Sequence, residues 1–127
     1  MSCAAQHRIL RIQPGELTFI RIDHQCRLQF ENTEIMIETP FSLQVEDREY
    51  QLDPEDRANF GPLLAVYPNS LLSANVDSEA TLRLEFESGA RVIVRQDPDY
   101  EAWQVSGPDT YLVVCVPGTE GNLAVWS

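Results

Sequence analysis

The sequence has no lysine, few histidines and few cysteines. All nine basic residues in its 127 positions are arginines, and 20 acidic residues bring the formal net charge to −11. Proteins that bind nucleic acids need a basic surface to neutralise phosphates, so this composition disfavours that class. His7 and His24 do not form a His-x-x-x-His motif, and no two cysteines are spaced as Cys-x-x-Cys. We therefore expect no zinc site.

The three cysteines, Cys3, Cys26 and Cys115, are an odd number and lie far apart in the sequence. Cys115 lies within an apolar run typical of a buried strand, so we expect it to be a buried free thiol and the protein to fold without disulfides. The N-terminal residues lack the pattern of a signal peptide, and no run approaches about 18 consecutive apolar residues, so we expect no membrane span. These features favour a cytoplasmic protein.

Motifs of nucleophilic catalysis and of cofactor binding are also missing. The sequence contains no Gly-x-Ser-x-Gly and no glycine-rich phosphate loop, and its six glycines lie at expected turns. We therefore expect a protein that is not an enzyme and that carries no cofactor.

What is present is a strand pattern. Apolar residues alternate with polar ones in most segments, as in Leu82, Leu84 and Phe86, and turn residues recur about every 8–12 positions. The length of 127 residues suits a single domain over 1–127. We predict an α+β fold that is mainly antiparallel β, built as a strongly bent sheet or a partly open barrel.

One short helix is predicted over about 54–66. Asp53 can cap its N-terminus and Pro54 suits its first position, whereas a Gly-Pro pair in the middle should break or kink it. Three apolar residues are spaced as one face of this helix: Phe60, Leu64 and Tyr67. We expect that face to cover the sheet.

The acidic residues are concentrated in two segments. Residues 31–57 hold nine acids, and residues 96–127 hold five acids and no base. Such a concentration is typical of a solvated surface, but it also suits a face that attracts a basic partner. We predict a partner-binding face centred on residues 31–57 or on residues 96–109. Its candidate residues are Glu46, Asp47, Glu49, Tyr50, Asp97, Asp99, Tyr100, Glu101 and Trp103.

The alternating acids Asp97, Asp99 and Glu101 allow two other interpretations. Three carboxylates on one side of an extended chain could begin a site for a hard cation, but the segment lacks the glycine and the later glutamate of a calcium loop. Paired carboxylates could also act as acid and base, but only inside a cleft. We expect no metal and no catalysis here. We expect Trp103 to pack in the core; only if it is exposed can it contact a partner.

Three motifs in the C-terminal half are distinctive: Asp97-Pro98-Asp99-Tyr100-Glu101-Ala102-Trp103, Pro117-Gly118, and Leu123-Ala124-Val125-Trp126. On these residues the chain resembles a family of small uncharacterised bacterial domains that is common in actinobacteria. The resemblance covers the chain from about residue 52 to its end and implies no known reaction. Small, acidic, sheet-rich bacterial proteins are often immunity proteins for secreted toxins, and this association is not a physical argument.

Three functions remain open at this point. The first is a non-catalytic binding protein, such as an immunity protein that neutralises a basic toxin domain. The second is a domain that binds a small molecule or lipid in an apolar pocket between sheet and helix. The third is an accessory domain that stabilises an assembly.

Overall fold

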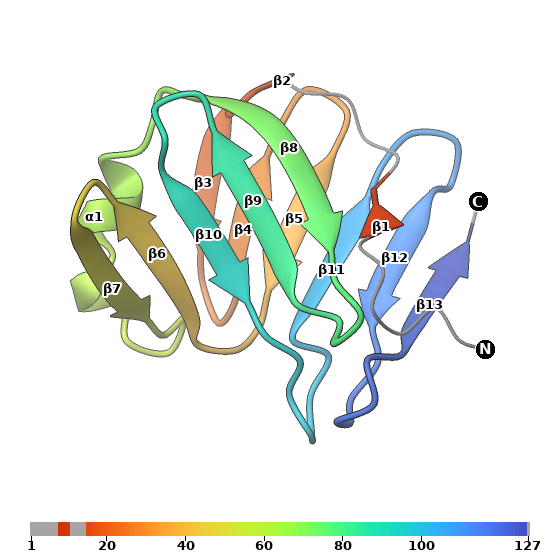
Figure 1. Cartoon of the computed structure of the whole chain (residues 1–127). Coiled ribbons are helices and arrows are strands. Elements are labelled where there is room, and N and C mark those ends of the chain that lie inside the picture. The colour runs from red at the N-terminus through yellow and green to blue at the C-terminus, as the bar shows by residue number, and fades with distance from the viewer. Residues whose placement is uncertain (1–7, 11–14, 127) are drawn as a thin grey trace.

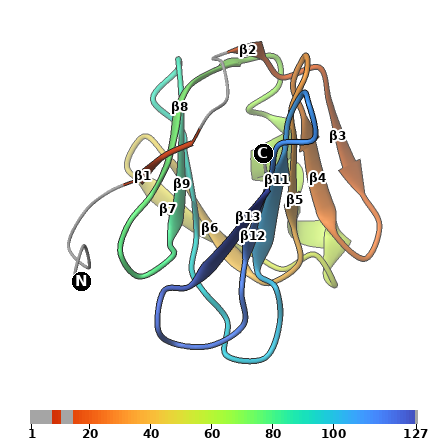
Figure 2. The same ribbon diagram turned by 90° about the vertical axis from the view of Figure 1, so that its right-hand side faces the viewer.

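The computed structural model describes residues 8–10 and 15–126, which form two antiparallel sheets that face each other (Figures 1 and 2). The first sheet has the order β1-β8-β9-β10-β6-β7, and β2 also pairs with β8. Its strands are β1 (Arg8–Ile9), β2 (Gly15–Glu16), β6 (Phe41–Val45), β7 (Arg48–Leu52), β8 (Ser70–Val76), β9 (Leu82–Phe86) and β10 (Arg91–Val94).

The second sheet has the order β13-β12-β11-β5-β4-β3. Its strands are β3 (Phe19–Ile22), β4 (Cys26–Gln29), β5 (Glu34–Ile37), β11 (Trp103–Ser106), β12 (Leu112–Cys115) and β13 (Leu123–Trp126). The predicted class, mainly antiparallel β with a short helical segment, is confirmed, and the strands form two facing layers without a closed barrel.

The core lies between the two sheets and follows the alternation in the sequence. Leu82, Leu84 and Phe86 of β9 are buried, while the arginine and the glutamate between them are partly exposed. Phe86 meets Phe30 from the other sheet, with ring centroids 6.3 Å apart. A period of two therefore places one face of each strand against the opposite sheet.

The helical segment differs in detail from the prediction. It consists of a 3-10 turn, η1 (Arg57–Asn59), and one turn of α-helix, α1 (Gly61–Leu64). The carboxylate of Asp53 accepts the backbone N–H of Glu55, as a helix cap would, but only a turn follows it and the first helical residue is Arg57. The sequence predicted a break at the Gly-Pro pair, and α1 begins there instead, because proline is tolerated in the first turn of a helix.

The predicted apolar face of this helix is wrong. Phe60 is buried and packs edge-on against Phe41, with ring centroids 6.0 Å apart, but Leu64 and Tyr67 are about half exposed. Leu63 and Val66 are buried in their place. Because the helix is only one turn long, the spacing of a longer helix does not apply to it.

Two further predictions have clear outcomes. Cys115 is buried, as predicted, and both Cys26 and Cys115 are free thiols; Cys3 lies outside the described residues, as does His7. Among the described residues, no helix is long and apolar enough to cross a membrane.

Candidate functional site

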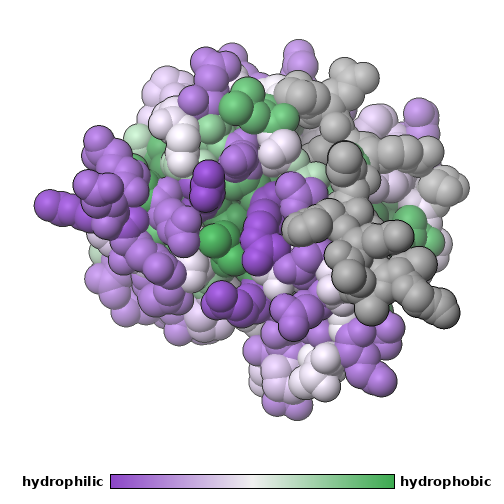
Figure 3. Space-filling view, viewed as in Figure 1, coloured by the Kyte–Doolittle hydropathy of each residue, from purple (hydrophilic) through white to green (hydrophobic). Residues whose placement is uncertain are grey.

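Three turns meet at one end of the sandwich, and two of them form a protrusion at the bottom of Figure 1. They are the turn 77–81 between β8 and β9, the loop 96–101 between β10 and β11, and the loop 116–122 between β12 and β13. We call this end the acidic tip, because it carries Asp77, Glu79, Asp97, Asp99, Glu101 and Glu120. The protruding end is largely hydrophilic in the space-filling view (Figure 3).

Gln96 joins two of these loops with both ends of its side-chain amide. Its Nε2 donates to the carbonyl oxygen of Val116 at 2.8 Å, and its Oε1 accepts the backbone N–H of Gly121 at 2.9 Å. A third bond runs from the N–H of Gly118 to the carbonyl oxygen of Asp97 at 2.9 Å. The two loops are therefore held together by three hydrogen bonds.

The third turn is fixed by close packing. Gly121 has a positive φ of 74°, and a methyl group added to it would overlap the backbone carbonyl oxygen of Ser78. Only glycine combines this backbone conformation with so close an approach of two loops. The contact seats the loop 116–122 directly on the turn 77–81.

Asp97 shapes the loop that carries the exposed residues. Its Oδ1 accepts the backbone N–H of Asp99 at 2.8 Å and that of Tyr100 at 3.1 Å. Asp99, Tyr100 and Glu101 all point into solvent, and Tyr100 is 66% exposed. β11 begins at Trp103, so Tyr100 lies in the loop. An exposed tyrosine thus stands between two exposed acidic residues in the sequence of a hydrogen-bonded loop.

Trp103 does not belong to the binding surface. Its side chain is fully buried, and its indole Nε1 donates to the carbonyl oxygen of Ala80 at 2.9 Å. As a partner-binding residue Trp103 is therefore excluded, and the alternative expectation of core packing is confirmed. Tyr50 is only partly exposed, because it packs against the core.

Asp77 organises the turn 77–81, which forms the base of the tip. Its Oδ1 accepts the N–H of Glu79 at 2.8 Å and of Thr81 at 3.1 Å, and its Oδ2 meets the guanidinium of Arg83 at 2.6 Å. Burial alone would raise the pKa of Asp77, but these hydrogen bonds and the charge of Arg83 outweigh it and lower that pKa below its usual value of 3.8. The carboxylate therefore stays ionised in the folded protein near neutral pH.

The hairpin of the first predicted acidic segment lies at the opposite end of the molecule from the tip. Glu38 of the same segment lies beside the tip, where its N–H donates to the carbonyl oxygen of Ala102 at 2.9 Å. Arg91, at the start of β10, pairs with Gln44 near the end of β6, and the tip loop follows the other end of β10. The β6–β7 hairpin, with exposed Glu46, Asp47 and Glu49, is thus remote from the tip. Residue 109 is also remote, because the turn 107–111 follows the far end of β11. The sequence could not show this separation, since it follows from the order of strands in the sheet.

Nothing in the described part of the chain brings three or more metal-ligating side chains together. Asp97 uses its carboxylate to hold its own loop, while Asp99 and Glu101 are exposed on either side of Tyr100. The absence of a metal site and of catalysis at these acids stays a prediction.

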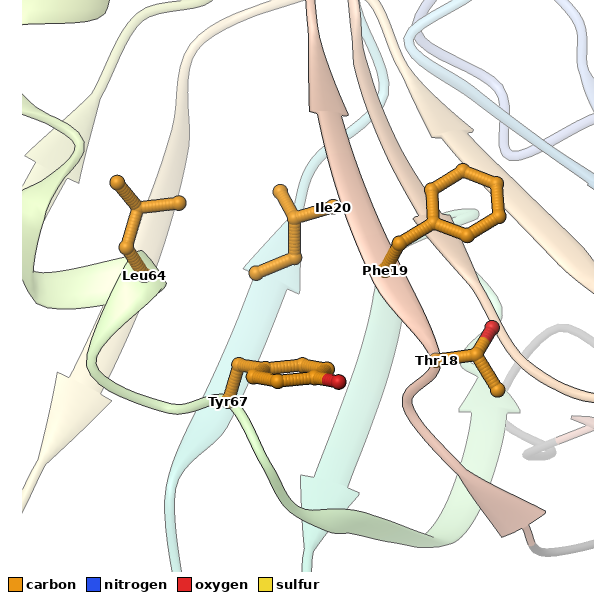
Figure 4. Close-up of a pocket in the computed structure, with 5 residues that line it drawn as sticks. All are labelled: Thr18, Phe19, Ile20, Leu64 and Tyr67. Carbon is orange, nitrogen blue, oxygen red and sulfur yellow. The ribbon is translucent and has the colours of Figure 1, made fainter.

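Two pockets lie on either side of the segment after α1. One, of about 300 Å³, is lined by Thr18, Phe19, Ile20, Leu64 and Tyr67 (Figure 4). The other, of about 360 Å³, is lined mainly by Pro62, Ala65, Val66 and Pro68 together with the turns at 45–46, 69 and 88–90. The pocket of about 300 Å³ lies between sheet and helix, where a protein that binds a small molecule was expected to hold its ligand. This pocket is open to solvent. Ligand sites usually bury most of the ligand, so the pocket does not favour that function.

A comparison with protein-family models matches residues 9–127 to a family of unknown function (DUF6188). The chain belongs to this family. No curated protein and no solved structure matches the chain. The match to DUF6188 spans nearly the whole chain and agrees with the resemblance to an uncharacterised domain, but it assigns no reaction, ligand or partner. The functional argument for this DUF6188 member therefore rests on the geometry of the acidic tip.

Sequence reasoning missed two parts of that geometry. The turn 77–81 was not recognised as part of the site, although an aspartate at the end of an alternating strand is a signal for a side-chain-capped turn. Gln96 was missed as well, because nothing in the sequence shows which loop its amide reaches.

Proposed function

We propose that this protein is a non-catalytic binding protein that docks its acidic tip on a basic surface of another protein. The observation that carries the proposal is the loop 96–101, in which Asp97 holds Tyr100 exposed between Asp99 and Glu101. The more specific form of the proposal is an immunity protein that neutralises a basic toxin domain.

Pre-organisation supports this role. A loop that is already held by hydrogen bonds loses less conformational freedom on binding than a free loop does. Three such bonds join the loop 96–101 to the loop 116–122. The tip is therefore already ordered in the folded protein and loses little conformational entropy on binding. More of the free energy of its contacts then contributes to affinity.

The chemistry of the exposed residues supports it as well. Tyrosine is enriched among the few interface residues that dominate affinity, because it buries a large ring at low entropic cost. The surrounding carboxylates, with a net charge of −11 for the chain, attract a basic partner and raise its association rate. The expected interface is thus a tyrosine anchor with an acidic rim.

The test compares two charge-reversed variants in affinity capture from an extract of the native host. The tip variant is Asp99→Arg with Glu101→Arg, which spares Asp97 because that side chain holds the loop. The matched control is Asp47→Arg with Glu49→Arg in the β6–β7 hairpin. Each variant changes the net charge by the same amount, from −11 to −7.

We expect the wild type and the hairpin variant to capture the same basic protein and the tip variant to lose it. The product of the gene next to that of this protein is the first candidate for the captured species. If the tip variant captures the partner as well as the wild type does, the tip is not the interface. If both variants lose it equally, binding depends on overall charge and not on the tip.

A further inference from the structure

The edge strand β13 lacks the features that protect most exposed sheet edges. It lies at the right-hand margin of the sandwich in Figure 1 and, among the described strands, pairs only with β12, from Leu123 opposite Cys115 to Trp126 opposite Leu112. Its four residues include no proline and no charged side chain, and no bulge interrupts its register. Native edge strands usually carry such features, because bare backbone groups pair with another chain. β13 is therefore suited to pairing.

The other edges of the two sheets are covered, short or charged. α1 and the segment 64–69 lie beside β3, and Leu17 just before β3 donates its N–H to the carbonyl oxygen of Asn69 at 2.8 Å. The outer edge of β8 is paired with β1 and β2, which have two residues each. The remaining edge strand, β7, begins with exposed Arg48 and Glu49. In the described part of the chain, β13 is thus the edge that is least protected.

The direction of the backbone groups in β13 follows from one hydrogen bond. The N–H of Val116 donates to the carbonyl oxygen of Asn122 at 3.1 Å, so these two residues form a hydrogen-bonded pair of the ladder. Hydrogen-bonded and non-hydrogen-bonded pairs alternate, so the even-numbered residues of β13 bond to β12. Leu123 and Val125 therefore direct their N–H and C=O groups to the open edge, and no other described element bonds to these groups.

The side chains of β13 are apolar on both faces of the sheet. Val125 lies opposite buried Val113, on the face that points to the core, and yet it is 59% exposed. Trp126 lies opposite Leu112, on the outer face, and is 53% exposed. A strand added at this edge would extend both faces of the sheet and cover these two side chains.

We propose that two copies of this chain pair through β13, antiparallel, about a twofold axis at Ala124. Leu123 of one copy then lies opposite Val125 of the other in a hydrogen-bonded pair, and the axis repeats this pair. Every outward N–H and C=O of the strand thereby finds a partner. The two six-stranded sheets become one continuous sheet across the dimer.

The side chains that meet in this register are uncharged, which favours a second copy as the occupant. Leu123 meets Val125 on one face, and on the other face Ala124 meets Ala124 while Trp126 meets Asn122. The chain carries −11, so two copies repel each other overall, but β13 adds no charge to the contact. A basic partner would find no electrostatic attraction in the strand itself. Since salt screens the overall repulsion, the dimer should strengthen as ionic strength rises.

Neighbouring registers use the edge less well. An axis at Leu123 would place Val125 opposite Gly121, whose N–H already donates to Oε1 of Gln96 at 2.9 Å. An axis at Val125 would use the outward groups of that residue alone within the described strand. Only the axis at Ala124 uses the outward groups of both residues.

Cysteine cross-linking tests the register. In a non-hydrogen-bonded pair the Cα atoms are about 4.5 Å apart, within the range that a disulfide spans, so Ala124→Cys brings two thiols together across the axis. In Val125→Cys each thiol lies opposite Leu123, and the two thiols are diagonal neighbours about 7–8 Å apart, which is too far for an unstrained disulfide. We expect Ala124→Cys to form the covalent dimer at least about tenfold faster than Val125→Cys.

The reaction uses oxidised glutathione and the full chain in a Cys3→Ser background. The native thiols Cys26 and Cys115 are buried and serve as internal controls, because they should not cross-link the folded protein. A circular dichroism spectrum like that of the wild type shows that each variant is folded.

Sedimentation equilibrium tests the location of the interface. Val125→Arg places a charge in the paired edge and should raise the dimer dissociation constant at least about tenfold, because charged side chains oppose edge pairing. Phe19→Arg is the matched control, since Phe19 is 50% exposed in β3, at the other edge of the same sheet, and the change in charge is the same. It should not weaken the dimer. General repulsion alone would make both arginine variants stronger dimers than the wild type.

Three results would overturn the proposal. The first is a wild-type chain that stays monomeric up to submillimolar concentration at high salt. The second is a Val125→Cys chain that cross-links as fast as Ala124→Cys, because the register would then be different. The third is a dimer that Phe19→Arg weakens as much as Val125→Arg does, because the interface would then not lie at β13.

Discussion

The indole N–H of Trp103 donates a hydrogen bond to the carbonyl oxygen of Ala80, with 2.9 Å between Nε1 and the oxygen. Trp103 begins β11 in one sheet, and Ala80 lies in the turn between two strands of the other sheet. Both residues are fully buried. This bond therefore joins the two layers directly below the acidic tip.

Trp103→Phe should destabilise the protein by about 1–3 kcal/mol, because it leaves a buried carbonyl oxygen without its strongest donor and removes part of the ring. Urea unfolding measures the change in the free energy of unfolding. Trp126→Phe is the control, since Trp126 is 53% exposed, and it should have little effect. Equal effects of the two substitutions would show that the bond to Ala80 contributes nothing.

Gly121→Ala should destabilise by more than about 2 kcal/mol, because it combines an unfavourable backbone conformation with overlap against Ser78. Gly89→Ala is the matched control. Gly89 also has a positive φ, of 96°, but no atom lies within 4 Å of an added Cβ. We expect a smaller loss there, of about 1–2 kcal/mol. If the two substitutions lower the free energy of unfolding equally, the contact between the loops does not contribute to stability.

Asp77→Asn should weaken the fold by about 1–3 kcal/mol at neutral pH, because its ionised carboxylate accepts bonds from Arg83 and two backbone N–H groups. The folded-state pKa of Asp77 is lowered, so this stabilisation is fully present above the unfolded-state pKa, near 3.8, and is lost as pH falls through the folded-state pKa. The difference between wild type and variant should therefore shrink below about pH 4. Chemical unfolding at several pH values checks this, and a difference that grows as pH falls would contradict it.

Cys26 and Cys115 should resist thiol reagents in the native protein. Burial raises the pKa of Cys26 to about 12 and that of Cys115 to about 11, so almost none of either thiol is ionised near neutral pH. The measurement is a thiol titration in a Cys3→Ser background, with and without denaturant. Both thiols should react only after unfolding, and rapid stoichiometric reaction of the folded protein would contradict their burial.

The strand framework could be predicted from the sequence, because it depends on local patterns. Alternation in segments such as β9 and turn residues between them define strands whatever their order. The helical face was wrong for a physical reason: after α1 ends, Tyr67 no longer follows helical spacing and turns to solvent. Local pattern does not show how tertiary packing shortens a helix.

The candidate site could be predicted only in part. Asp99 and Glu101 of the loop 96–101 were named as candidates from the sequence, and both are exposed. Trp103 was expected in the core and was also named as a candidate contact, and the structure buries it. A sequence does not show which aromatic residue crosses to the opposite sheet. The clamp by Gln96 and the separation of tip and hairpin depend on long-range pairing, which one sequence does not reveal.

The rate at which the captured basic partner associates with this protein, measured by stopped flow across ionic strength, tests the role of the acidic tip most directly. We predict that the wild-type rate falls by about tenfold or more from low to physiological salt, because ions screen the attraction. Asp99→Arg with Glu101→Arg should associate slowly at low salt, while Asp47→Arg with Glu49→Arg should keep most of the wild-type rate. An association rate that does not depend on salt, or that both variants reduce equally, would contradict the account.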